Sequence, residues 1–157
     1  MREVVLTKDG SHTIAIAEKG VTYHSVHGAV QESMHVFIEA GLGTILTSPD
    51  KTEISIFEMG FGTGLNAFLS ALVALEQQRP FFYTAVETAP LSAEEASLLN
   101  YSDSLGYGEL FTALHQCAWN EAVQVNDFFT LQKLHTELAA FSPSRPYDLV
   151  YYDAFAP

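Results

Sequence analysis

The stretch EISIFEMGFGTG, residues 53–64, decides the fold of this chain. It begins with an apolar run typical of a buried strand and ends in three glycines spaced two residues apart. Strong helix formers continue over 65–77, and an aromatic strand is expected at 81–87. Strand, glycine turn, helix and strand form one βαβ unit, which requires the two strands to be parallel. We therefore predict an α/β fold, a Rossmann-like sheet with helices packed on it.

Upstream of this unit the sequence predicts a small antiparallel β-meander. Its strands are expected in three β-prone runs, at 4–7, 12–17 and 21–25. The pair Asp9-Gly10 is a strong hairpin signal between the first two. A helix is expected over 31–40, because apolar residues recur there at helical spacing and two glycines, Gly41 and Gly43, suit its end.

Downstream, the pair Ser92 and Glu95 has the spacing of a capping box and predicts a helix over 93–99. Further strands are expected at 128–131 and 147–152. Alternation in the last of these predicts that only one of Tyr151 and Tyr152 faces the core. We divide the chain into an N-terminal unit, residues 1–45, and a Rossmann-like core, residues 46–157. Because the sequence stops just past a strand, we expect a fragment that lacks the C-terminal strands of its sheet.

Composition narrows the class of protein. The chain has 157 residues, of which 48% are hydrophobic and 17% charged, so a disordered chain is excluded. Cys117 is the single cysteine, which excludes a disulfide scaffold. No apolar run is long enough to span a membrane, and the N-terminus lacks the pattern of a secretory signal. We expect a cytoplasmic protein with no membrane partner.

The charge balance bears on possible partners. Seven Lys and Arg residues stand against nineteen Asp and Glu residues, which gives a net charge of −12. The seven cations are scattered along the sequence, so no basic stripe is available to follow a phosphate backbone. This balance disfavours binding of nucleic acid by this chain alone, because such binding relies on clustered positive charge.

The glycine turn predicts a nucleoside cofactor. A dinucleotide site would need a glycine where Leu65 stands, so that pattern fails by one residue. The pattern E-x-G-x-G-x-G, with Glu58 two residues before the first glycine, fits S-adenosylmethionine better. Glu58 could neutralise the amino group of its methionine part. Glu87, at the end of the next strand, could accept hydrogen bonds from both ribose hydroxyls.

The histidines give no metal site. His24, His27 and His35 match no standard ligand spacing, and no cysteine or carboxylate pairs with them, so we expect no metal. We expect His115 and His135 at the surface or at helix ends.

Three sequence motifs, taken in order, carry a resemblance to a known family. They are FGTGLN at 61–66, E-x-x-P-L beginning at Glu87, and DAFAP at 153–157. The stretch HGA at 27–29 and the pair Glu32-Ser33 also match the pattern of this family. Over nearly its whole length the chain resembles the methyltransferase domain of the MnmC family, the tRNA 5-methylaminomethyl-2-thiouridine biosynthesis proteins. It looks like a stand-alone member truncated after the D-x-F-x-P motif.

This resemblance implies a Rossmann-like methyltransferase that moves a methyl group from S-adenosylmethionine to the aminomethyl nitrogen of a wobble uridine in tRNA. Asp153 would hold the amine and take its proton, and Phe155 would pack on the flipped-out base or form a wall of the pocket. Glu32 would contact the cofactor amine, directly or through another residue. The expected cofactor-binding residues are Glu58, Gly60, Phe61, Gly62, Thr63, Gly64, Asn66, Glu87 and Glu32.

Other readings stay open. Bifunctional members of the family carry a flavin oxidase domain, which nothing here resembles, so a separate FAD-containing oxidase subunit is a possible partner. The acidic charge would also suit a small amine as the methyl acceptor. A third reading is a non-catalytic module that binds S-adenosylmethionine and serves an oxidoreductase. The Gly-Asp pair that frames adenine in such enzymes has no clear counterpart in residues 133–137.

Overall fold

The computed structural model describes residues 2–16, 21–22, 28–34, 38, 41–47 and 52–152. Two sheets are present in these parts of the chain. The smaller is an antiparallel meander in the order β1-β2-β3. Its strands are β1 (Arg2–Leu6), β2 (His12–Ile16) and β3 (Val21–Thr22). This confirms the predicted N-terminal meander.

The larger sheet has five strands in the order β6-β7-β5-β4-β8. They are β4 (Ile54–Met59), β5 (Phe81–Glu87), β6 (Ala122–Asn126), β7 (Phe129–His135) and β8 (Leu149–Tyr152). β4 pairs in parallel with β5 on one side and with β8 on the other, and β5 pairs in parallel with β7. Only β6 is antiparallel to its neighbour. The α/β fold and the βαβ unit are therefore confirmed.

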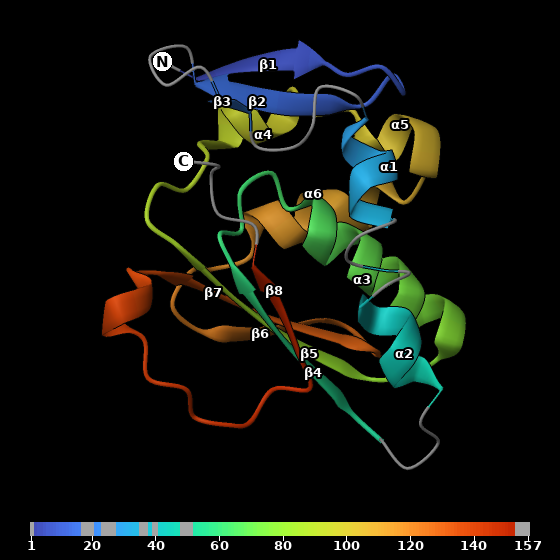
Figure 1. Ribbon diagram of the computed structural model, residues 1–157, viewed down its shortest axis with the longest axis vertical. Helices are drawn as coiled ribbons and strands as arrows, with labels where there is room; N and C mark the ends of the chain where they lie inside the picture. The colour runs from blue at the N-terminus through green and yellow to red at the C-terminus, as the bar shows by residue number, and fades with distance from the viewer. Residues whose placement is uncertain are drawn as a thin grey trace.

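Short helices and one long helix join these strands. They are α1 (Ala29–Ser33), α2 (Gly43–Leu46), α3 (Leu65–Gln77), α4 (Ala93–Ser97), α5 (Tyr101–Leu105), α6 (Gly108–Gln116) and the 3₁₀ helix η3 (Leu138–Ala140). The three-stranded sheet lies at the top of Figure 1, on the side to which the arrows of β4 and β8 point. The carboxyl ends of these strands therefore face the N-terminal meander.

The topology fixes where a ligand can bind. The glycine turn follows β4 along the chain. The next strands, β5 and β7 among them, lie on one side of β4, and the last strand, β8, lies on the other side. In open α/β sheets, ligands bind at the carboxyl ends of the strands where the strand order reverses. The glycine turn that follows β4 stands at this point.

Strand alternation separates the two faces of the sheet. Tyr83 in β5 packs its ring against Phe129 of β7 and Tyr151 of β8, with centroids 5.6 and 6.2 Å apart. Tyr151 is 2% exposed and Tyr152 is 66% exposed, which confirms that only one of the pair faces the core.

The turn of the N-terminal hairpin also caps a helix. Three backbone N–H groups at the start of α1, those of residues 29–31, donate to the side chains of Thr7, Ser11 and Asp9 at 3.2, 3.2 and 3.0 Å. The Asp9 carboxylate also accepts from the backbone and side chain of Ser11. Burial acts to raise the pKa of Asp9, but these hydrogen bonds outweigh it and lower the pKa to about 2. The hairpin thus satisfies donors that a helix start leaves unpaired.

Some predicted elements differ from the structure. The predicted end of the 31–40 helix is wrong, because Gly41 is part of a π-helical turn and Gly43 begins α2. At Gly41 an added Cβ would make an ordinary van der Waals contact with Leu149 of β8, at 3.4 Å, so this glycine lies against the sheet. The strand expected at 128–131 continues to residue 135 as β7. α5, α6 and β6 were not predicted.

Candidate functional site at the glycine turn

The glycine turn adopts a backbone that other residues rarely accept. Gly60, Gly62 and Gly64 have φ values of 89°, 56° and 79°. The Gly60 N–H donates to the Val86 carbonyl of β5 at 2.8 Å, and the Gly64 carbonyl accepts from Phe68 in the first turn of α3 at 2.8 Å. The turn is therefore fixed at both ends, to the neighbouring strand and to the helix that follows.

Gly64 also has no room for a side chain. A Cβ at this position would lie 2.8 Å from Nε2 of His115 and 3.0 Å from Cζ of Phe61. The third glycine of the motif is thus required by packing behind the turn as well as by its φ angle.

Beneath the turn lies a buried carboxylate. Glu58, the penultimate residue of β4, is 1% exposed. One of its oxygens accepts from the Tyr83 hydroxyl at 2.8 Å and the other from Nδ2 of Asn66 at 2.9 Å. Burial, and next the charge of Glu58, raise the pKa of Tyr83 well above its usual value, so the phenol remains a donor.

Asn66 leaves one polar atom unsatisfied. Because the Glu58 carboxylate accepts, the amide nitrogen of Asn66 must face it, which fixes the orientation of the amide. Its Oδ1 is buried and has no hydrogen-bond partner among the residues that the structure describes. A buried acceptor without a donor is costly, and a ligand ammonium or hydroxyl group could supply that donor.

Glu87 is held at the carboxyl end of β5. Its Oε1 accepts from the Gly62 N–H at 2.7 Å, and its Oε2 accepts from the Ala89 N–H at 3.1 Å. The side chain is half-buried. An ionised carboxylate can accept about four hydrogen bonds, so two acceptor positions remain beyond these two. The residue is rigidly oriented and still able to bind a pair of hydroxyl groups.

Sequence reasoning missed the part played by His115. This residue lies in the last turn of α6, and it is half-buried against the glycine turn, with Nε2 2.8 Å from the Thr63 carbonyl. A carbonyl only accepts, so Nε2 carries the proton. Burial lowers the pKa of His115 to about 4, with the charge of Lys133 acting in the same direction and the bond to Thr63 opposing both. The ring is therefore neutral at pH 7. His135, by contrast, is exposed.

Lys133 is a second residue that the sequence did not reveal. It alternates with Phe129 and Leu131 along β7, so its side chain is on the buried face, and it is 0% exposed. Burial lowers its pKa.

The Lys133 ammonium is held by π systems and a carbonyl. Its Nζ donates to the His115 carbonyl at 3.0 Å and lies 4.7 Å from the ring centroid of Trp119 and 5.4 Å from that of Phe61. Cation–π contacts of this kind strengthen when they are removed from water. Phe61, from the glycine turn, is thereby anchored into the protein.

His115, which contacts the glycine turn, also lines a pocket of about 490 Å³. It lies among α4, α5 and α6, and begins where the segment after Glu87 enters α4. Its lining combines apolar and hydroxyl-bearing side chains: Leu91, Ser92, Ala96, Phe111, His115 and Trp119 are among them. This volume is within the range of small-molecule sites in proteins.

A pH effect on stability follows from His115. The unfolded side chain takes up a proton near pH 6.5, whereas the folded one does so only near pH 4, so the unfolded state binds more protons between these values. Stability is therefore full above about pH 6.5 and falls as the pH drops towards 4, by up to about 3 kcal/mol. Thermal unfolding measured between pH 7 and pH 4.5 should show this loss. His115→Gln, which keeps an N–H donor, should show a flatter profile; equal slopes for the two proteins would contradict the assignment.

The structure brings most of the predicted cofactor residues to one edge of the sheet. They are Glu58, Gly60, Phe61, Gly62, Thr63, Gly64, Asn66 and Glu87. The side chains of Phe61 and Thr63 are buried, 4% and 0% exposed, so these residues can offer a ligand only their backbone. Glu32 lies in α1, but its side chain is outside the described part of the chain.

Other predicted residues fall outside the described ranges. This holds for Asp153 and Phe155 and for the three histidines considered as metal ligands, His24, His27 and His35. Among the residues that are described, no group of three or more His, Cys, Asp or Glu side chains could hold a metal ion. Within the same ranges, no helix has both the length and the apolar character needed to cross a membrane.

The strand order and the glycine turn after β4 define a Rossmann-like α/β fold. The structure is similar to that of MnmC2 from Aquifex aeolicus, with a TM-score of 0.80 and 24% sequence identity. The match covers 100% of this chain and 50% of the other, so this chain spans half the length of that protein. No protein-family model matches the chain, and no curated protein sequence matches it.

Proposed function

We propose that this protein binds S-adenosylmethionine at the glycine turn and transfers its methyl group to an amine. The observation that carries the proposal is Glu87, whose carboxylate is held by the Gly62 and Ala89 N–H groups with two acceptor positions left. Two adjacent acceptors at this strand end suit the two hydroxyls of a ribose.

Other residues at and beneath the glycine turn also suit S-adenosylmethionine. Gly60 and Gly62 have positive φ angles, which favour glycine, and they carry no side chain that could stand between the main chain and a ligand. The unpartnered Oδ1 of Asn66 could accept from the amino group of the methionine part, with the charge of Glu58 immediately behind it. S-adenosylmethionine, when bound, supplies an electrophilic methyl group. The protein contributes by fixing the position of the ribose and by placing negative charge near the ammonium group.

For the acceptor, we propose the aminomethyl nitrogen of a wobble uridine in tRNA. The resemblance to the MnmC family and the similarity to the fold of MnmC2 support this choice. Asp153 would hold the amine and remove its proton, because a protonated amine has no free electron pair. Phe155 would stack on the base or form a wall of the pocket. A tRNA substrate implies the cytoplasm as compartment.

A small amine is the second candidate acceptor, and the net charge of −12 favours it. An acidic protein repels a phosphate backbone unless another subunit, such as a separate FAD-containing oxidase, supplies a basic face. Three hypotheses can therefore be separated by experiment: methyl transfer to tRNA, methyl transfer to a small amine, and binding of S-adenosylmethionine without methyl transfer.

The test begins with binding of S-adenosylmethionine and of S-adenosylhomocysteine by calorimetry. Labelled S-adenosylmethionine is then offered with tRNA carrying the unmethylated aminomethyl uridine, and separately with simple primary amines. Label in the wobble nucleoside supports the tRNA assignment, whereas label only in free amines overturns it in favour of a small acceptor. Binding without transfer to either supports a non-catalytic module. Absence of binding overturns the whole proposal.

A further inference from the structure

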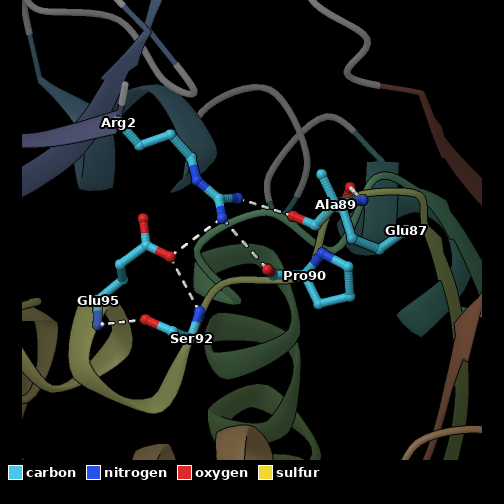
Figure 2. Close-up of polar contacts among 6 residues, drawn as sticks. All are labelled: Arg2, Glu87, Ala89, Pro90, Ser92 and Glu95. Carbon is cyan, nitrogen blue, oxygen red and sulfur yellow. Dashed lines mark hydrogen bonds and ion pairs between the residues drawn. The ribbon is translucent and has the colours of Figure 1, made fainter.

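A side chain of the N-terminal sheet contacts the segment that follows Glu87. Arg2, the first residue of β1, donates from Nη1 to the Ala89 carbonyl at 2.8 Å and from Nη2 to the Pro90 carbonyl at 3.4 Å. Nη2 also forms an ion pair with Oε1 of Glu95 at 3.0 Å (Figure 2). One guanidinium group therefore bridges the meander to the connection between β5 and α4.

The same short connection orients Glu87. The Ala89 N–H donates to Oε2 of Glu87, while the Ala89 carbonyl accepts from Arg2, so this residue is held from both sides (Figure 2). Further along, Oε1 of Glu95 accepts from Arg2 and also from the Ser92 N–H at 3.0 Å. Arg2 thus holds the segment directly at Ala89 and Pro90, and indirectly at Ser92 through the Glu95 carboxylate.

The location of the contact explains why it should affect binding more than stability. The side chains of Arg2 and Glu95 are 26% and 27% exposed, so their ion pair is partly screened by solvent. Glu87, however, must present two acceptors in a fixed geometry, and any freedom of the segment after it has to be removed when a ligand binds. A contact that removes this freedom beforehand improves affinity without a new contact to the ligand.

We infer that Arg2 is a positioning residue for the ribose-binding carboxylate: it orders residues 88–92 and through them sets the orientation of Glu87. The N-terminal meander then contributes to the proposed nucleoside-binding site, although it lies outside the Rossmann-like sheet. This inference rests on the proposed function, because it takes Glu87 to be the group that binds the ribose.

The experiment measures the Kd of S-adenosylhomocysteine for the wild type, Arg2→Ala and Arg2→Lys. Arg2→Ala should raise the Kd about tenfold, in line with the cost of ordering a few side chains and a loop on binding. Arg2→Lys retains the charge beside Glu95 but cannot reach both carbonyls, so an intermediate value is expected. In a transfer assay, KM for S-adenosylmethionine should rise while kcat stays within about twofold.

Arg145→Ala is the matched control. Arg145 forms an exposed ion pair with Glu53 at 2.9 Å and stacks on Phe82, at the opposite end of the strands from the glycine turn. The Arg145→Ala variant should change the thermal midpoint of unfolding about as much as Arg2→Ala does, and it should leave the Kd of S-adenosylhomocysteine unchanged. Equal Kd changes for the two variants would overturn the inference, because they would point to a general loss of stability.

Two further measurements separate this inference from the proposed function. If Arg2 acts through Glu87, Arg2→Ala should add little to the Kd in a Glu87→Gln background; additive effects would overturn it. In the ligand-free protein, the Gly62 and Ala89 amides should exchange with solvent faster in Arg2→Ala than in the wild type. Unchanged exchange would overturn the inference even if S-adenosylmethionine binds, and faster exchange would support the ordering of this segment even if no binding is found.

Discussion

Replacing Glu87 with glutamine should weaken the binding of S-adenosylmethionine about a hundredfold. The carboxylate is proposed to accept from both ribose hydroxyls, and hydrogen bonds to a charged acceptor contribute about 1.5–3 kcal/mol each. Glutamine retains one oxygen and presents an NH₂ group where the second oxygen stood. That group would meet a backbone N–H, either of Gly62 or of Ala89, so the amide side chain must also turn away. A loss of about 3 kcal/mol corresponds to the hundredfold change.

Calorimetry with S-adenosylhomocysteine checks this expectation without requiring turnover. The matched control is Glu94→Gln, which makes the same charge change on an exposed residue in the first turn of α4. A second comparison uses an analogue without the ribose hydroxyls: the wild type should bind it as weakly as Glu87→Gln binds the parent compound. A Kd for Glu87→Gln within threefold of the wild type would remove Glu87 from the site.

Gly64→Ala should cost about 3–4 kcal/mol of the free energy of unfolding. At a φ of 79° the new Cβ brings a strain of about 1–2 kcal/mol. It would also stand 2.8 Å from Nε2 of His115 and 3.0 Å from Phe61, so these rings must move and the bond of His115 to the Thr63 carbonyl is lost. Overpacking of this kind adds about 1–3 kcal/mol. Denaturant unfolding measures the sum.

Gly10→Ala separates the two contributions. Gly10, in the N-terminal hairpin turn, has a φ of 85°, and an added Cβ there meets nothing within 4 Å. This variant should show the backbone strain without the collision, and a cost of about 1–2 kcal/mol is expected. If both variants lose the same free energy, the packing behind the glycine turn is not what requires Gly64.

The sequence was most informative where local patterns and tertiary contacts agree. α3 and β5 have the predicted bounds, because an apolar helix broken before Pro80 and an aromatic strand are strong local signals. The capping box of Ser92 and Glu95 is present with both of its hydrogen bonds. In the candidate site, the positions of the glycine turn after β4 and of Glu87 at the end of β5 could be predicted for the same reason, since both follow from local strand and turn signals.

Elements defined by distant contacts could not be predicted. α6 begins after Tyr107, which has a left-handed φ of 59° and offers no recognisable cap, and the helix is held by packing of Phe111 on Phe68 of α3. His115 reaches the glycine turn only because α6 docks there. Lys133 carries a charge, which favours exposure, and its burial depends on aromatic rings supplied by two other segments.

The hairpin cap of α1 has a consequence for the order of assembly. α1 has five residues, too few to persist by itself in water, and its first three amides find their acceptors in Thr7, Asp9 and Ser11. The first turn of this helix is therefore stable only once the hairpin has closed. Folding of the helix is conditional on the strands that precede it, so the two elements gain or lose their structure as one cooperative unit.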